Sequence, residues 1–154
     1  MKRRIYLDAS VIGGCCDEEF AQVSTRLLEE CRQGACVAVI SDLTRRELAE
    51  APAAVQAHLA SLPDAQIESV CLTAEAERLA QRYVAEGVVG ASHVVDAQHI
   101  AMATLERVDV LVSWNFKHIV NLERIHGFNA VNLKGGYPLL EIRSPTEVIH
   151  AEDL

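Results

Sequence analysis

The sequence predicts an α/β domain whose sheet is mainly parallel. Short apolar runs of strand length alternate along the chain with longer segments that have helical spacing. One run, CVAVI at residues 36–40, is apolar throughout, which is typical of a strand covered on both faces. The chain contains no repeat, low-complexity tract or linker. With 154 residues, half of them apolar, we expect a single domain spanning residues 1–154.

In the first half of the chain, residue types that end strands and helices mark the boundaries. Asp8 closes the first strand. An amphipathic pattern predicts a helix that Gly34 ends, and Ser41 is placed to cap the next helix. The predicted elements are, in order, strand 3–8, helix 19–33, strand 36–40, a helix from Ser41 to before Pro52, and a short helix 52–61.

The second half continues this alternation. Thr73 and Ser92 are candidate caps for two helices. Near the end, Ser144 and Glu147 form a capping box with Pro145 at the first helical position. The predicted elements are strand 67–72, helix 73–87, helix 94–104, strand 108–113, and a helix that follows Ser144.

Composition narrows the class of protein. The net charge of −8 argues against binding of nucleic acid through a general surplus of lysine and arginine. The five cysteines form no C-x-x-C pair, so neither a disulfide framework nor a zinc knuckle is expected. No apolar run approaches the roughly 20 residues of a membrane span, and the basic start meets an aspartate too early for a signal peptide. We therefore expect a cytoplasmic protein with no membrane segment.

Acidic and amide side chains follow several of the predicted strands. Asp8 ends the first strand, and Asn115 comes two residues after the strand 108–113. Glu47 lies on the helix after the second strand, and Asp96 lies near the start of a later helix. In open parallel sheets, ligand sites form outside the carboxyl ends of the strands. The four side chains are therefore expected to meet in one cleft.

Three carboxylates and an amide in one cleft predict a bound cation. Without a cation, the carboxylates would repel one another and take up protons. Mg²⁺ or Mn²⁺ prefers such oxygen ligands, and either ion keeps several waters. A metal-held water is a nucleophile, and an ion that also binds a phosphate oxygen aligns that water for attack on a phosphodiester. We therefore predict metal-binding and catalytic roles for Asp8, Glu47, Asp96 and Asn115.

Other residues near these four are candidates for supporting roles. Ser10 and Ser113 are placed to orient the ligands or their waters. His99 shares a helix face with Asp96, so it is a candidate partner of a ligand or of the substrate, or else a hydrogen-bonded core histidine. The candidate cations for contact with substrate are Arg45, Arg46, Lys117, His118 and, at the start of the chain, Lys2, Arg3 and Arg4.

Each proposed ligand also has an ordinary structural explanation. Asp8 could cap the helix that follows it, and Asp96 could be a first-turn aspartate favoured by the helix dipole. Glu47 could complete a capping box with Thr44, and Asn115 could be a turn residue. The metal-site hypothesis therefore depends on all four occurring together.

Four segments resemble a known family in their order and spacing. They are YLDASVIGG at 6–14, RRELAEA at 45–51, DAQHIAMAT at 96–104 and LVSWNFKHIVN at 111–121. The resemblance is to the PIN-domain fold, in particular to the VapC-like toxins of prokaryotic type II toxin–antitoxin systems, and it extends to GYPLLEIRSPTEVI near the end. It implies a three-layer sandwich in which helices flank a mainly parallel central sheet. It also implies that Asp8, Glu47 and Asp96 are the acidic metal ligands.

The same resemblance implies an activity and partners. The expected activity is that of a Mg²⁺- or Mn²⁺-dependent endoribonuclease, a hydrolase that cuts RNA. The expected assembly is a homodimer, and the expected partner is a small antitoxin whose tail blocks the cleft. Asn115 stands where many PIN domains have a fourth acid, usually aspartate, whereas the branch with a W-N-F-K-H motif has asparagine there. Because an amide adds no charge, a second metal should bind more weakly, which favours chemistry with one metal.

Two other functions are compatible with the sequence. A catalytically degenerate PIN module would bind RNA or a protein partner without cleavage, in keeping with Asn115 and the acidic composition. A phosphorelay receiver also places acids at strand ends. However, a receiver needs an acidic pair after its first strand and a lysine after its last, whereas Asp8 is followed here by Ala-Ser.

Overall fold

Five parallel strands form the sheet of the computed structural model, which describes residues 2–149. The strands are β1 (Arg3–Leu7), β2 (Cys36–Ser41), β3 (Ile67–Val70), β4 (Val110–Val112) and β5 (Ile142–Arg143). Their order across the sheet is β3-β2-β1-β4-β5, and every neighbouring pair is parallel. The prediction of a mainly parallel sheet is confirmed, although β5 was not predicted.

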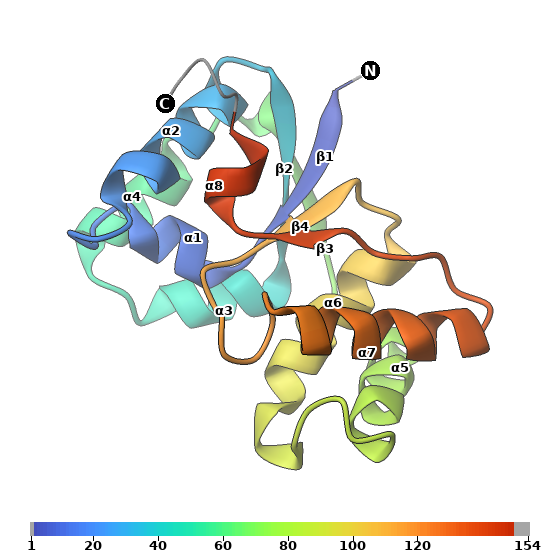
Figure 1. The fold of residues 1–154 in the computed structure, drawn as a ribbon. Helices are drawn as coiled ribbons and strands as arrows, with labels where there is room; N and C mark the ends of the chain where they lie inside the picture. The colour runs from blue at the N-terminus through green and yellow to red at the C-terminus, as the bar shows by residue number, and fades with distance from the viewer. Residues whose placement is uncertain (1, 150–154) are drawn as a thin grey trace.

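Helices cover both faces of the sheet (Figure 1). On one face pack α5 (Ala74–Ala85), α6 (Val94–Leu105) and α7 (Leu122–Lys134). On the other pack α1 (Ala9–Gly14), α2 (Ala21–Arg32), α4 (Ala53–Ala60) and α8 (Pro145–Val148). The remaining helix, α3 (Asp42–Ala49), follows β2 directly and contributes to both layers. The three-layer sandwich matches the predicted fold class. Among residues 2–149, no helix has the length and apolar character that a membrane crossing requires.

The central strand β1 contributes side chains to both hydrophobic cores. Ile5 and Leu7 pack into the core that contains α1 and α2, whereas Tyr6 packs into the core with α5 and α6. All three side chains are fully buried. This alternation follows from the period of two along a strand, and burying each such side chain contributes roughly 1.5–3 kcal/mol. A strand with two buried faces has no polar alternation, which explains the continuous apolar runs in the sequence.

Most of the predicted helix caps are present. The Ser41 hydroxyl accepts a hydrogen bond from the N–H of Thr44, and Thr73 caps α5 in the same way. The capping box at the start of α8 is also formed. The prediction that Ser92 caps α6 is wrong. A short 3-10 turn, η2 (Ala91–His93), runs directly into α6 and places Ser92 inside the turn.

The sequence analysis did not identify α7. Its buried residues Phe128 and Val131 are spaced one helical turn apart, and Asn121 caps its first turn by accepting from the N–H of Arg124 at 2.9 Å. Gly127 interrupts the pattern because a Cβ at this position would lie 2.8 Å from a Val88 methyl group. The sequence therefore contains a cap and apolar spacing for this helix, but the glycine at its centre makes the helical pattern hard to recognise.

The carboxyl ends of β1, β2 and β4 lie along one edge of the sheet. Leu7 pairs with Val112, so the residues that follow the two strands emerge side by side. The chain leaves this edge as α1 after β1, as α3 after β2, and as a loop at residues 113–121 after β4. These three segments build the candidate site.

Candidate active site

Asp8 lies where β1 ends, and hydrogen bonds fix both of its carboxylate oxygens. The residue is only 6% exposed. Oδ1 accepts from the backbone N–H of Ser10 at 3.1 Å and from its hydroxyl at 2.6 Å. Oδ2 accepts from the Ser113 hydroxyl at 2.5 Å. Asp8 therefore caps α1, and the two serines orient a carboxylate that points along the edge of the sheet.

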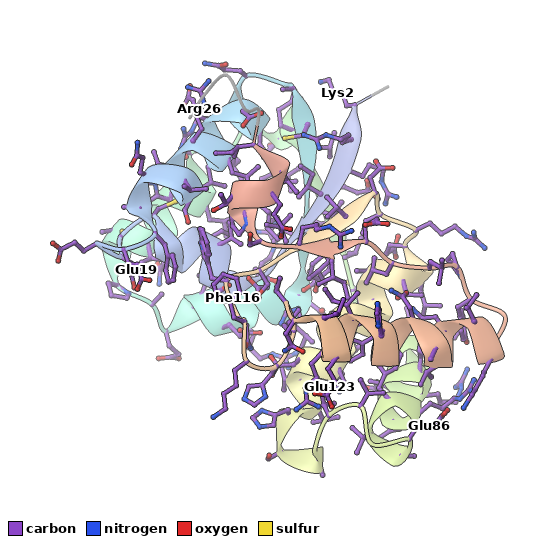
Figure 2. All side chains as sticks on the ribbon, in the orientation of Figure 1. Lys2, Glu19, Arg26, Glu86, Phe116 and Glu123 are labelled. Carbon is purple, nitrogen blue, oxygen red and sulfur yellow. The ribbon has the colours of Figure 1, made fainter. Side chains whose placement is uncertain are left out.

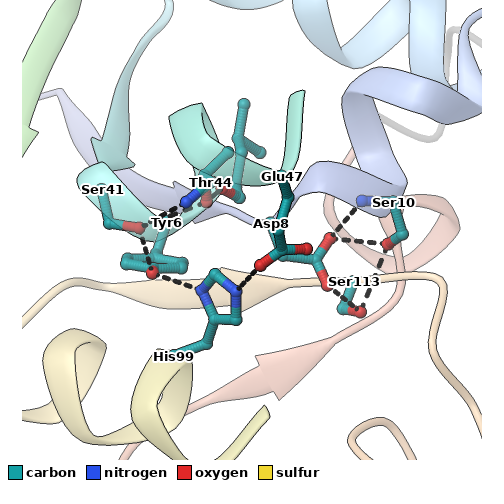
Figure 3. Close-up of polar contacts among 9 residues, drawn as sticks. Tyr6, Asp8, Ser10, Ser41, Thr44, Glu47, His99 and Ser113 are labelled. Atoms are coloured by element: carbon teal, nitrogen blue, oxygen red, sulfur yellow. Dashed lines mark hydrogen bonds and ion pairs between the residues drawn. The ribbon is translucent and has the colours of Figure 1, made fainter. Parts of the chain in front are cut away.

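Buried His99 connects Glu47 to the central strand (Figure 3). Nε2 of His99 lies 2.6 Å from Oε1 of Glu47, and Nδ1 lies 2.6 Å from the Tyr6 hydroxyl oxygen. The Tyr6 hydroxyl donates to Oγ of Ser41 at 2.8 Å. His99 is thus both a core histidine and the partner of a proposed ligand. The capping box considered for Glu47 is not the arrangement found, because Ser41 caps α3 and Thr44 is buried within it.

Asp96 lies in the first turn of α6, with about a quarter of its side chain exposed (24%). Its Oδ2 atom is 3.7 Å from Nδ1 of His93. The His93 ring stacks on His118, with ring centroids 3.7 Å apart. This stack joins the start of α6 to the loop after β4.

Asn115 takes the turn role that the sequence analysis had kept as an alternative. Its Oδ1 accepts from the N–H of His118 at 2.9 Å, and its own N–H donates to Oγ of Ser113 at 3.0 Å. The same serine donates to Asp8. Asn115 is therefore attached to the Asp8 carboxylate through a single hydroxyl group.

Burial is the main influence on the two aspartates, and Glu47 adds to it. Burial raises the pKa of Asp8, and Glu47 raises it further against the hydrogen bonds of the two serines and the charge of His99. Burial also raises the pKa of Asp96, and Glu47 again adds to the effect while nearby histidines oppose it. Glu47 thus acts on each of the two aspartates.

The donor chemistry fits a hard divalent cation, although the side chains are not gathered around one. In residues 2–149, no group of three or more His, Cys, Asp or Glu side chains has a metal-binding arrangement. Oε1 of Glu47 is engaged by His99, and both oxygens of Asp8 are engaged by serines. Burial nevertheless opposes ionisation of Asp8 and Asp96 beside a third carboxylate. A positive charge at this edge would favour the ionised form of both aspartates.

The predicted cations fall into two groups. Arg46 on α3 and Lys117 in the loop after β4 are exposed beside the acidic edge, while Arg45 donates to Ser69 on β3. Three other cations lie at the start of β1, at the opposite end of the strand from Asp8: Lys2, Arg3 and Arg4. They are occupied by contacts there, including a salt bridge from Arg4 to a glutamate of β3. The prediction that they contribute positive charge to the site is wrong.

Sequence reasoning missed Tyr6, Thr44 and His93. Tyr6 precedes Asp8 by two positions in an extended segment, so its side chain lies on the same side, and this spacing was an available signal. His93 precedes Asp96 by three residues, which is close to one helical turn. Thr44 had no such signal. Its hydroxyl donates to the carbonyl of Leu7, 37 positions earlier in the chain, and a contact between such distant residues leaves no local pattern.

Three solved structures resemble this chain. A chain of VapBC2 from Rickettsia felis, bound to a DNA fragment from the promoter, has 13% identity and a TM-score of 0.58, with coverage of 92% of this chain and 98% of that chain. VapC20 of Mycobacterium tuberculosis, a sarcin-ricin loop cleaving toxin, has 15% identity, a TM-score of 0.57 and coverage of 74% and 92%. DNA-bound VapBC from Salmonella typhimurium has 18% identity, a TM-score of 0.55 and coverage of 94% and 99%.

At these identities the likeness concerns the fold. No protein-family model matches the sequence, and no curated protein is significantly similar to it. The three-layer arrangement, the parallel sheet and the near-complete coverage agree with the resemblance noted in the sequence. The chain has the fold of the VapC PIN-domain toxins.

Proposed function

We propose that this chain is a metal-dependent endoribonuclease and the toxin of a toxin–antitoxin pair. One observation carries the proposal: in a VapC-like fold, Asp8 is buried at the carboxyl edge of the sheet, and Glu47 disfavours the ionisation of both Asp8 and Asp96. Carboxylates whose ionisation is disfavoured destabilise the folded protein at neutral pH, and a bound cation would offset that destabilisation. Carboxylates in such surroundings are therefore candidates for a functional site.

In this proposal Asp8, Glu47 and Asp96 hold Mg²⁺ or Mn²⁺, with Asn115 as a fourth oxygen donor. When bound, the ion supplies positive charge to the phosphate and makes a water molecule more acidic. Ser10 and Ser113 keep the Asp8 carboxylate directed along the edge through their hydroxyl groups. His99 holds Glu47 in place, since Tyr6 fixes the other side of the imidazole.

The fold neighbours support the proposed substrate and partners. VapC20 is named for cleavage of the sarcin-ricin loop, which favours structured RNA as the substrate. Two neighbours are VapBC complexes bound to DNA, which favours a small antitoxin as partner. Arg46 and Lys117 are exposed and, in this proposal, contact the RNA backbone. We further propose a cytoplasmic homodimer, in keeping with the expectation from the sequence.

A second candidate function is a PIN module that binds RNA or protein without cutting. Two contacts favour it. The Asn115 oxygen already closes a turn by accepting from His118, and Glu47 is already bound by His99. Each of these two oxygens therefore has one fewer lone pair available for a metal ion.

Cleavage of labelled RNA in the presence of EDTA, Mg²⁺ or Mn²⁺ separates the two functions. The enzyme hypothesis predicts cleavage with a metal and none with EDTA. Asp8→Asn and Asp96→Asn should abolish cleavage, since each removes a ligand charge, while circular dichroism shows an intact fold. Asp64→Asn makes the same chemical change at an exposed position on η1 (Asp64–Gln66) and should keep full activity. Absence of cleavage with either metal would support the binding module.

A further inference from the structure

We propose that Phe116, supported by Trp114 and Phe20, forms a stacking site for an unpaired nucleobase beside the acidic edge. The nature of the ligand rests on the proposed ribonuclease function. The site would explain how an acidic protein holds RNA, because stacking needs no surplus of positive charge.

Aromatic residues are scarce in this chain but gather at one place. The sequence has three phenylalanines and one tryptophan, and two of the phenylalanines contact that tryptophan. Phe20 stacks on Trp114 with ring centroids 4.2 Å apart and planes inclined by 20°. Phe116 meets Trp114 edge-on at 6.1 Å and is 50% exposed. Figure 2 labels Phe116 between α1 and the start of α7.

Trp114 is anchored rigidly next to the proposed metal ligands. Its indole Nε1–H donates to Oγ of Ser24 at 2.8 Å. Its backbone N–H donates to Oγ of Ser10 at 3.0 Å, and that hydroxyl donates to Asp8. The sequence also leaves room for the indole, since a Cβ at Gly14 would lie 2.9 Å from Nε1. The aromatic cluster is thus separated from a proposed ligand by one serine.

The surroundings of Phe116 suit single-stranded RNA. The neighbouring Lys117 is exposed, and within residues 2–149 it forms no salt bridge. An aromatic face beside a free cation is the combination that binds bases and phosphates of single strands. Phe116 also forms part of the wall of an open hollow of about 600 Å³, together with Asn121 and Arg143. The hollow offers room for a base beside the ring.

A fluorescence experiment tests the site without relying on cleavage. Trp114 is the only tryptophan of the chain, so its emission reports on this cluster alone. The full chain in EDTA is titrated with a short oligoadenylate and with an abasic oligonucleotide of the same length. We expect quenching by the oligoadenylate and little by the abasic strand. Phe116→Ala should weaken binding about tenfold or more, as expected for loss of one stacked base. Phe116→Tyr should retain binding.

Leu133→Ala is the matched control, because it removes an exposed apolar side chain at the far end of α7 and should leave binding unchanged. Equal binding of the two strands, absence of quenching, or full RNA affinity in Phe116→Ala would overturn the proposal. If Phe116→Ala keeps RNA affinity but lowers the molar mass measured by light scattering, the surface is a protein interface, which also overturns it.

The two proposals fail separately. Base-dependent quenching that Phe116→Ala weakens, without cleavage in any metal, would retain the stacking site and remove the nuclease function. The opposite outcome is metal-dependent cleavage that Asp8→Asn abolishes, together with a Phe116→Ala variant that binds RNA as tightly as the wild type does. It would retain the nuclease function and remove the stacking site.

Discussion

Nε2 of the buried residue His99 lies 2.6 Å from Oε1 of Glu47, so a core histidine on α6 fixes a carboxylate on α3. His99 itself is fixed by Tyr6 through its other ring nitrogen. One imidazole therefore connects the interior of the protein to the proposed metal site.

His99→Ala should weaken metal binding and cleavage by about 10- to 100-fold, the usual effect of removing the partner of a metal ligand. The variant should also lose stability of about 1–3 kcal/mol, because the buried Tyr6 hydroxyl loses a partner. Calorimetry with Mn²⁺ and urea denaturation measure the two effects. His58→Ala, on α4, is the control. Unchanged metal affinity in His99→Ala would mean that Glu47 needs no support.

Asp8→Asn should make the metal-free protein more stable at neutral pH than the wild type. Burial raises the pKa of Asp8 in the folded state, so the fold favours the neutral carboxyl group. The stability that the wild type gains from this neutral carboxyl group is complete at pH values below the pKa of Asp8 in the unfolded chain. It is lost as the pH rises through the pKa of Asp8 in the folded protein. Urea denaturation in EDTA should therefore show the advantage of Asp8→Asn growing from acidic to neutral pH. A difference that is independent of pH would contradict this account.

Asn115→Asp should tighten Mn²⁺ binding, because it adds a negative charge next to the acidic cluster. The turn should survive, since an aspartate oxygen can also accept from the N–H of His118. Titration calorimetry compares this variant with Gln81→Glu, which adds the same charge on the exposed surface of α5. If both variants bind Mn²⁺ like the wild type, residue 115 is not a ligand.

Gly14→Ala and Gly13→Ala should have opposite effects on stability. An added Cβ at Gly14 would lie 2.5 Å from Oγ of Ser24 and 2.9 Å from Nε1 of Trp114, so overpacking should cost about 1–3 kcal/mol. At Gly13 no atom lies within 4 Å of the added Cβ, and the better helix propensity should stabilise the protein by about 0.5–1 kcal/mol. Thermal unfolding followed by Trp114 fluorescence measures both. Similar melting temperatures would show that the indole can move away.

The sequence predicted the positions of the acids better than their contacts. Asp8 could be found because it ends an apolar strand, and the carboxyl ends of parallel strands share an edge. The bond between Glu47 and His99 could not be predicted, because it joins residues 52 positions apart whose approach depends on how α3 and α6 pack. Local patterns specify strands and caps, whereas contacts between layers depend on the packed core.

The missed elements have a similar explanation. β5 has only two residues, Ile142 and Arg143, which is too short for any periodic pattern. Serine is a common helix cap, but Ser92 lies inside the turn η2, which runs directly into α6, so it is not at the cap position. In both cases the neighbouring strand or helix decides the local structure.

The hydrogen bond from Ser113 to Asp8 spans 105 positions of the chain. Since β4 pairs beside β1 at the centre of the sheet, a partly synthesised chain lacks both β4 and the serine that follows it. In a fragment that ends before residue 113, the Asp8 carboxylate would therefore have hydrogen bonds from Ser10 only. The geometry of this carboxylate is thus completed only when the second half of the chain has been added to the sheet.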